Sequence, residues 1–183
     1  RLEAVTATPD VALRTEDPSF ITDEGNRIGG LVGTNEGVIK ESHARGDVDG
    51  YVAAGGFAGK NEGVITDSEA TGETAGESHI GGFVGENHGL RSEIVDSEAE
   101  NTVVGAGFSI GGFAGKNHGT IADAAATVEI EMTGTNGGGF VGNNDGQITG
   151  AQAAGTLDGD GNQIGGFAGK NSGDVIGSST DVG

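Results

Sequence analysis

The sequence contains no cysteine and no tryptophan, and only 2 of its 183 residues are proline. Because no disulfide can form, packing and hydrogen bonds must hold the fold together. Aromatic residues are also scarce, with 7 phenylalanines and 1 tyrosine, which excludes a thick core of large side chains. No apolar run approaches the length that crosses a membrane, so we expect no membrane insertion in this segment. A thin core of aligned small and medium-sized side chains remains available.

Basic residues are few, and this shortage limits the choice of partners. The chain has 9 Lys and Arg residues against 28 Asp and Glu residues, which gives a formal net charge of −19. Such a surface repels nucleic acid and anionic lipid, and we expect neither as a partner. Acid-rich, lysine-poor surfaces are similar to those of extremely halophilic proteins, which is the interpretation we favour. Calcium binding is the alternative explanation for so many Asp, Asn and Gly residues.

Glycine, in contrast, is abundant, and its distribution reveals an internal repeat. The chain has 39 glycines without a persistent Gly-X-Y triplet, which excludes a collagen. The pattern Gly-Gly-[Phe/Leu]-[Val/Ala]-Gly-x-Asn-x-Gly occurs six times instead, at intervals of 26, 26, 30, 27 and 27 residues. The copies begin at Gly29, Gly55, Gly81, Gly111, Gly138 and Gly165. A repeat of this length points to a stacked architecture.

The repeat predicts an all-β fold. Short alternating apolar segments interrupted by glycine are typical of strands and tight turns, whereas so many glycines would destabilise helices. One unit cannot bury its own apolar face and becomes stable only by stacking on its neighbours. We therefore predict a β-solenoid (β-helix) of about six coils of 26–30 residues over residues 28–183. Residues 1–27 lack the repeat and are predicted to be an extended N-terminal cap, or a strand donated to a neighbouring molecule.

Stacking at the normal strand separation of about 4.8 Å would place equivalent residues above one another. Two structural ladders follow, one of phenylalanine and one of asparagine, and we expect both to point inward. The neighbouring Val/Ala column is expected on the opposite face, and the glycines beside each asparagine are expected to supply positive φ angles. The ladder members are Phe57, Phe83, Phe113, Phe140 and Phe167, and Asn35, Asn61, Asn87, Asn117, Asn144 and Asn171.

The repeat unit and the small-residue strand after it resemble the GLUG motif. That motif occurs in bacterial and archaeal surface proteins, including filamentous-haemagglutinin-like adhesins and the non-catalytic part of immunoglobulin-A-cleaving metallopeptidases. The resemblance covers residues 28–183 and implies an exported, surface-attached, elongated protein with no catalytic residue. The sequence departs from the pattern in the third copy, which contains an insertion, and before the fifth, where Gly137 replaces the usual isoleucine.

Few residues suggest chemistry, and we expect the chain not to be an enzyme. It lacks the His-Glu-x-x-His string of zinc peptidases, and its basic residues are too scattered for a polysaccharide lyase. His88 and His118 share a repeat position and could pair on a metal, although we favour a solvated column. The segment from Asp158 through Asp160 to Asn162 resembles the start of a calcium loop, but a polar turn in an acidic protein is the interpretation we favour. We expect no cofactor, with Ca²⁺ or other counter-cations as the alternative.

These observations favour an extracellular structural or adhesion module of a cell-surface protein. It would act as an acidic scaffold whose partners are further copies of itself, other surface proteins or glycans. We expect the chain to be a processed or excised piece, with its export signal or anchor outside it. The alternative is a complete subunit that assembles head to tail into an extracellular filament, because heterologous contacts of that kind produce open fibres.

Overall fold

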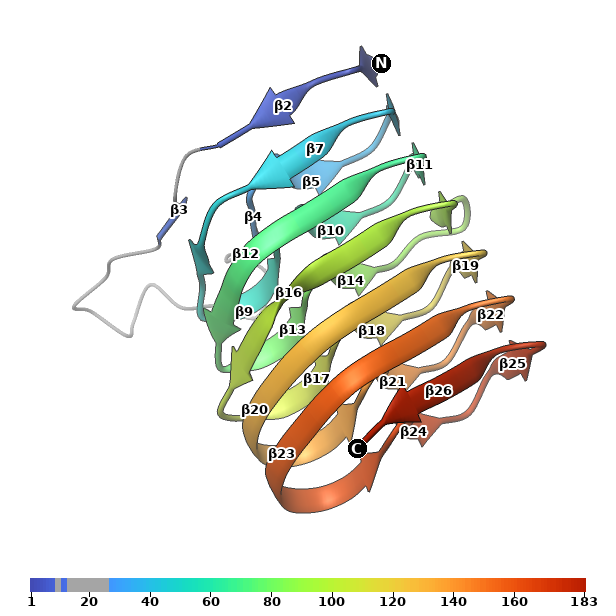
Figure 1. The fold of residues 1–183 in the computed structure, drawn as a ribbon. Helices are drawn as coiled ribbons and strands as arrows, with labels where there is room; N and C mark the ends of the chain where they lie inside the picture. The colour runs from blue at the N-terminus through green and yellow to red at the C-terminus, as the bar shows by residue number, and fades with distance from the viewer. Residues whose placement is uncertain (9–10, 13–26) are drawn as a thin grey trace.

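The computed structural model describes residues 1–8, 11–12 and 27–183, and within these ranges the backbone forms only strands, turns and irregular segments. The strands stack into a β-solenoid (Figure 1), which confirms the all-β prediction. We number its coils one to six, as residues 27–50, 51–76, 77–105, 106–132, 133–159 and 160–183. Equivalent strands of successive coils pair in parallel, because every coil runs in the same direction.

Three parallel sheets run along the stack. The seven-stranded sheet contains β1 (Leu2–Glu3), β6 (Val38–Lys40), β11 (Val64–Thr66), β15 (Glu93–Val95), β19 (Thr120–Ala122), β22 (Gln147–Thr149) and β25 (Asp174–Ile176). The six-stranded sheet contains β5 (Val32–Asn35), β10 (Ala58–Asn61), β14 (Val84–Asn87), β18 (Ala114–Asn117), β21 (Val141–Asn144) and β24 (Ala168–Asn171). Each coil therefore contributes one short strand to each of these two sheets.

The third sheet curves around the outer bend of each coil, and we call it the bent sheet. Its arm before the bend contains β2 (Thr6–Ala7), β3 (Val11–Ala12), β7 (His43–Arg45), β8 (Val48–Asp49), β12 (Glu69–Gly76), β16 (Glu98–Gly105) and β26 (Ser179–Val182). Its arm after the bend contains β4 (Ile28–Gly29), β9 (Val52–Gly55), β13 (Ser78–Gly81) and β17 (Phe108–Gly111). Two long strands run through the bend, β20 (Ala125–Gly138) and β23 (Gln152–Gly165).

The core is thin and consists of columns of like residues. Ile65 pairs with Ile94, and Ile121 pairs with Ile148, so branched side chains lie one above another. The phenylalanine and asparagine columns point inward as predicted, and Phe57, Phe83, Phe113 and Phe140 are fully buried. Stacking thus gives each coil the burial that it cannot achieve alone.

The expectation that the Val/Ala column lies on a face directed away from the core was wrong. Ala58, Val84, Ala114 and Val141 are fully buried and belong to the same hydrophobic core as the phenylalanines. The adjacent glycine column faces the post-bend arm, and a Cβ on Gly59 would lie 2.5 Å from the backbone nitrogen of Ile28. Only glycine fits at such a backbone contact.

The expected positive φ angles beside the asparagines were also misplaced. Left-handed backbone occurs at the corner after each strand of the seven-stranded sheet, with φ of 49° at Glu41 and 52° at Asp67. Most glycines two residues after an asparagine have a different purpose. A Cβ on Gly63 would overlap the Gly37 carbonyl oxygen of the coil below, and Gly119, Gly146 and Gly173 are enclosed in the same way. Close approach between coils, and not turn conformation, fixes these glycines.

The described part of the N-terminal segment forms one more partial rung. Leu2 pairs with Ile39, Ala7 with Ala44 and Val11 with Val48, all in parallel and within the same chain. The backbone nitrogen of Val5 donates to Ser42 Oγ, 37 residues further along the chain. The rest of the segment predicted as a cap or donated strand, residues 9–10 and 13–26, lies outside the described residues.

Candidate functional site

A continuous ladder of asparagine side chains follows the turns between the six-stranded and the seven-stranded sheets. In each step Nδ2 of one asparagine donates to Oδ1 of the asparagine in the next coil, at 2.8 or 2.9 Å. The ladder runs through Asn35, Asn61, Asn87, Asn117, Asn144 and Asn171. Since every donor points toward the C-terminal end of the stack, the ladder is polar.

Each asparagine also holds its own turn. Asn61 Oδ1 accepts from the backbone nitrogen of Gly63 at 3.3 Å, and Nδ2 donates to the Gly63 carbonyl oxygen at 3.1 Å. The same Nδ2 lies 3.3 Å from the carbonyl oxygen of Glu93 in the next coil. These contacts satisfy a fully buried amide, which is costly to leave unpaired. The ladder therefore has a structural role.

The phenylalanine column is a second internal support. Its rings lie parallel within 7°, with centroids 4.7–5.0 Å apart. It runs through Phe57, Phe83, Phe113, Phe140 and Phe167. Leu31 of coil one packs against the same core. The ring separation matches the strand spacing, so stacking adds to burial without disturbing the register.

The calcium candidates lie on β23, one of the two long strands that run through a bend. Asp158, Asp160 and Asn162 are alternate residues of this strand, and all are exposed. Because strand conformation continues through all three residues, they do not form the turn along which a calcium loop places its ligands. Among residues 1–8, 11–12 and 27–183, no group of three or more His, Asp or Glu side chains is arranged to hold a metal ion.

A column of alternating charge lies beside the asparagine ladder. Lys60, Glu86 and Lys116 occupy one register position in three successive coils. Glu86 Oε1 lies 2.6 Å from His79 Nδ1. The His79 imidazole, helped by the charges of the two lysines, lowers the pKa of the Glu86 carboxyl against the opposing effect of burial. The alternation thus separates like charges and stabilises a half-buried carboxylate.

His88 and His118 lie on adjacent rungs, as their shared repeat position predicts. Their ring centroids are 4.5 Å apart and the rings meet edge to face at 61°. His118 Nε2 lies 3.4 Å from Asp145 Oδ2. Burial, followed by the positive charge of Lys116 and by His88, lowers the pKa of His118, although Asp145 opposes this shift. Neutral His118 is therefore favoured in the folded chain.

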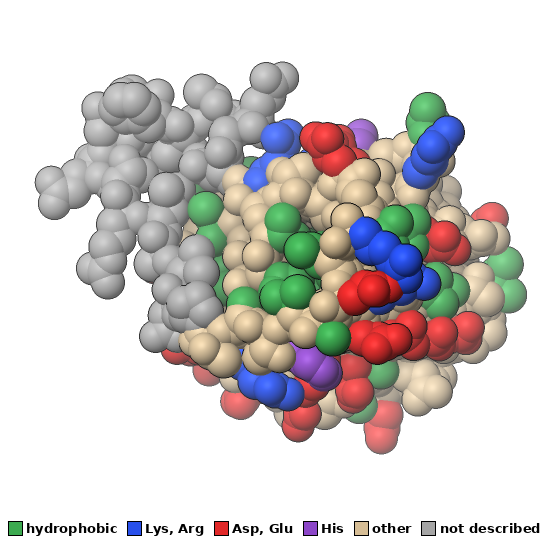
Figure 2. Space-filling view, turned by 90° about the horizontal axis from the view of Figure 1, so that it is seen from above, with side chains coloured by type: hydrophobic (Ala, Val, Ile, Leu, Met, Phe, Trp, Pro, Cys, Tyr) green, Lys and Arg blue, Asp and Glu red, His purple; other side chains and the backbone are tan. Residues whose placement is uncertain are grey.

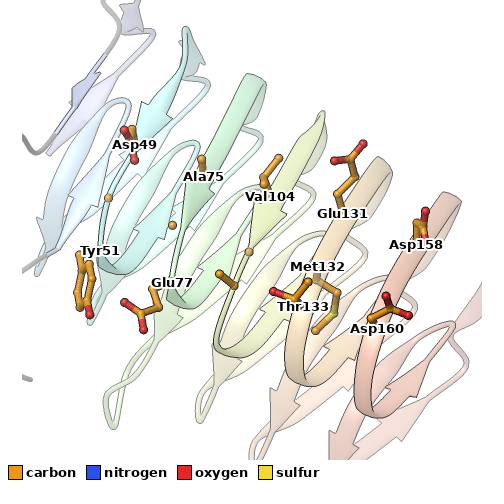
Figure 3. Close-up of a pocket in the computed structure, with 14 residues that line it drawn as sticks. Asp49, Tyr51, Ala75, Glu77, Val104, Glu131, Met132, Thr133, Asp158 and Asp160 are labelled. Atoms are coloured by element: carbon orange, nitrogen blue, oxygen red, sulfur yellow. The ribbon is translucent and has the colours of Figure 1, made fainter.

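The described surface also contains a groove that the sequence did not indicate. It has a volume of about 720 Å³ and follows the outer bends across several coils (Figure 3). Residues just before and just after each bend form its two walls, and carboxylates are frequent among them. At one end, hydrogen bonding to Glu77 and the charge of that carboxylate raise the pKa of Tyr51. No sequence signal marked the groove, because its walls consist of positions that vary between copies.

Charged side chains of both signs lie at the N-terminal end of the stack. Figure 2, which looks down the stack from that end, shows Asp and Glu side chains in clusters, with groups of Lys and Arg side chains beside them. At the corner after the seven-stranded sheet, Asp67, Asp96 and Asp123 follow one another on successive coils, each with φ near 50°. Like charges repeated at the strand spacing repel each other.

Taken together, the parallel sheets and internal ladders define a β-solenoid built from short glycine-rich repeats. A model of the GLUG motif matches residues 24–49, 50–75 and 76–104, which correspond closely to coils one, two and three. The chain therefore carries consecutive GLUG-motif repeats, which confirms the resemblance seen in the sequence. The later coils continue the same register, as the pairing of Ile94 with Ile121 and of Ile121 with Ile148 shows.

A comparison with curated proteins gave no match, and neither did a comparison with solved structures. No helix among the described residues is long and apolar enough to cross a membrane. The GLUG motif and the solenoid thus identify a repeat-built structural module.

Proposed function

We propose that this module is an extracellular adhesion or scaffold segment of a cell-surface protein. The observation that supports the proposal best is the unbroken asparagine ladder, whose steps of 2.8 or 2.9 Å connect all six coils. Together with the phenylalanine column it makes a rigid stack from internal residues alone. The outer side chains are then available for contacts, and their net acidity keeps the scaffold soluble.

The proposal includes the absence of enzymatic activity. No family motif transfers a catalytic residue to this chain, and the ion pairs of the charged column stabilise neighbouring coils. Release of soluble sugar from acidic polysaccharides by the purified chain would contradict this part of the proposal.

Localisation can be tested on the cells that make the protein. An antibody raised against the solenoid should label intact cells as strongly as permeabilised ones, with a cytoplasmic protein as the control that requires permeabilisation. Labelling that appears only after permeabilisation would overturn the extracellular assignment.

The second candidate is a filament subunit, in which the parallel pairing of successive coils would continue from one copy to the next. β24 and β25 are the last strands of their sheets, and Val175 and Ile176 are 38% and 52% exposed there. Within the described residues, Asn171 Nδ2 donates to the Gly173 carbonyl oxygen but to no further asparagine. In a filament, β1 and β5 of another copy could extend these two sheets, and its Asn35 could extend the ladder.

Electron microscopy of the purified chain distinguishes the two candidates. Uniform fibres that disappear in a Val175→Lys variant would support head-to-tail assembly. Isolated short rods in both samples would favour the segment of a larger surface protein.

A further inference from the structure

The groove on the outer bends is shaped by the alternation of side chains along a strand. Residues directly before and after the bend point outward, whereas the residue between them points into the core. Gly50, Gly76 and Gly105 occupy this middle position in the first three bends and line the groove. The backbone therefore forms its floor, and two rows of outward side chains form its walls (Figure 3).

The side chains that form the walls change from acidic to apolar and back to acidic along the groove. One row runs through Asp49, Ala75, Val104, Glu131 and Asp158, each paired in register with the next. Carboxylates therefore stand at both ends of this row, with small apolar side chains between them. From the first to the fifth member the row is about 19 Å long at the normal strand spacing.

The second row repeats this arrangement. It begins with Tyr51 and Glu77, passes Ala106 and Thr133, and ends at Asp160. Each end of the groove thus has carboxylates on both walls, while Ala75, Val104 and Ala106 make the middle apolar. The pattern is acidic, apolar, acidic.

No positive charge of the described chain balances these carboxylates. The groove is lined by no Lys, Arg or His among the described residues. Elsewhere, carboxylates find partners, as Glu62 does with Lys60 at 2.7 Å and Glu69 with His43 at 2.9 Å. Within the described ranges, Glu131, Asp158 and Asp160 take part in no such ion pair. A ligand with separated positive charges would complement them.

We propose that the groove binds an extended peptide segment of another protein, with basic residues at both ends and small apolar residues between them. Such a segment would place its cations against the two acidic ends and its apolar side chains over Val104 and its neighbours. A strand rises about 3.3 Å per residue, so some six or seven residues match the length of the groove. A volume of about 720 Å³ exceeds what a single file of methylene groups fills, which favours a peptide over a linear polyamine.

This inference gives the proposed adhesion module a class of partner and rests on that function only for its biological setting. Binding is measured on the purified chain, so it can succeed or fail whatever the localisation experiment shows. The probe is a fluorescent heptapeptide with two lysines at each end and Ala-Val-Ala between them. Fluorescence anisotropy at about 0.1 M salt, where exposed charges are only partly screened, reports its affinity.

Two variants test the site directly. The triple variant Glu131→Gln, Asp158→Asn, Asp160→Asn should weaken binding by about 10-fold, since it removes one acidic end. The matched control is Asp67→Asn, Asp96→Asn, Asp123→Asn, which changes the net charge equally but alters the corner column outside the groove. This control should change the affinity less than about twofold. Ala106→Trp narrows the apolar middle without changing charge, at an exposed site where folding is not at risk, and it should also weaken binding.

Two competitors complete the experiment. A permuted heptapeptide with its four lysines together in the middle should bind about fivefold more weakly, because its charges face the apolar section. Spermine should compete poorly. Equal binding of the permuted peptide or equal competition by spermine would overturn the proposal, because either would show recognition of charge alone. Equal weakening by the two triple variants would overturn it as well.

Discussion

In one bend of the solenoid, the large and the small inward-pointing residues have exchanged positions relative to the other bends. This exchange allows a direct test of the packing. Three of the other bends have glycine at the inward position and isoleucine a few residues later, where it fills the space. A Cβ on Gly76 would lie 2.5 Å from Ile80 Cδ1, and one on Gly159 would lie 2.9 Å from Ile164 Cδ1. In the bend between coils four and five, the large residue comes first, as Met132, and the glycine second, as Gly137.

The two positions of this inverted pair share one volume. Met132 is only 4% exposed, and a Cβ on Gly137 would overlap its Sδ. Gly137→Ile alone should therefore destabilise the chain by about 1–3 kcal/mol through overpacking. Met132→Gly alone should cost about 3–5 kcal/mol, because it leaves a cavity and adds a flexible glycine.

The double variant Met132→Gly, Gly137→Ile restores the arrangement of the neighbouring bends. The new isoleucine would lie between Ile110 and Ile164, which pair with position 137 on either side. We expect its stability to lie within about 1.5 kcal/mol of the parent, above that of the Met132→Gly single variant. The resulting coupling energy should be at least about 2 kcal/mol.

Urea unfolding followed by circular dichroism measures all four free energies of unfolding. Coupling of this size would show that the two side chains compete for one site. If the single effects add within about 0.5 kcal/mol, the two positions do not share space and the packing argument is refuted. The transplanted pair Gly76→Met, Ile80→Gly is the matched control, and it should be tolerated for the same reason.

Three further predictions concern the ladder and the charges. Asn117→Ala should lower the free energy of unfolding by about 2–4 kcal/mol, since it breaks both 2.8 Å ladder bonds, whereas Asn171→Ala at the exposed end should cost less in the same urea titration. Asp96→Asn should raise the free energy of unfolding by about 0.5 kcal/mol at low salt, because it relieves repulsion from Asp67 and Asp123. The control is Asp174→Asn, since Asp174 lies next to the neutral Gln147 and should gain nothing. An equal gain in the control, or a gain from Asp96→Asn that persists in 2 M KCl, would contradict this prediction. Because the pKa of His118 is lowered in the folded chain, the unfolded chain binds this proton more tightly. The free energy of unfolding should therefore be highest above the ordinary histidine pKa of about 6.5 and should fall as the pH drops below it. The lowered pKa of Glu86 should add a further loss below about pH 4.3. Thermal melting between pH 7.5 and 5.5 should show the first loss in the parent and a flatter profile in His118→Ser, and identical profiles would disprove the assignment to His118.

The sequence was sufficient for the solenoid because its structural residues repeat. Asn61 and Asn87 occupy one position of the repeat, and stacking requires them to meet. The burial of Ala58 could not be predicted in the same way, because strict alternation along a straight strand places it on the face opposite to Asn61. The left-handed corner could not be predicted either. It is occupied by Asp67 and its equivalents, and although aspartate tolerates a positive φ, it does not indicate one in a sequence as glycine does.

The exchange at Met132 and Gly137 shows a similar limit. The sequence revealed Gly137 as a departure from the pattern, but its compensation lies five residues earlier, in a column where glycine is usual. Only the contact across the bend connects the two. The groove was missed for a related reason, since its walls are positions at which the copies differ and which the repeat pattern ignores.

That difference between columns suggests where function should be sought in a repeat protein of this kind. Coils contact only their neighbours, so any column that must support the stack is held nearly constant, as the phenylalanine and asparagine columns are. Outward columns carry no such requirement, and a change of residue there costs little stability. The row from Asp49 to Asp158 nevertheless changes in order, from acidic to apolar and back to acidic, along a continuous groove. An outer column ordered on the scale of several coils is best explained by a ligand that spans those coils.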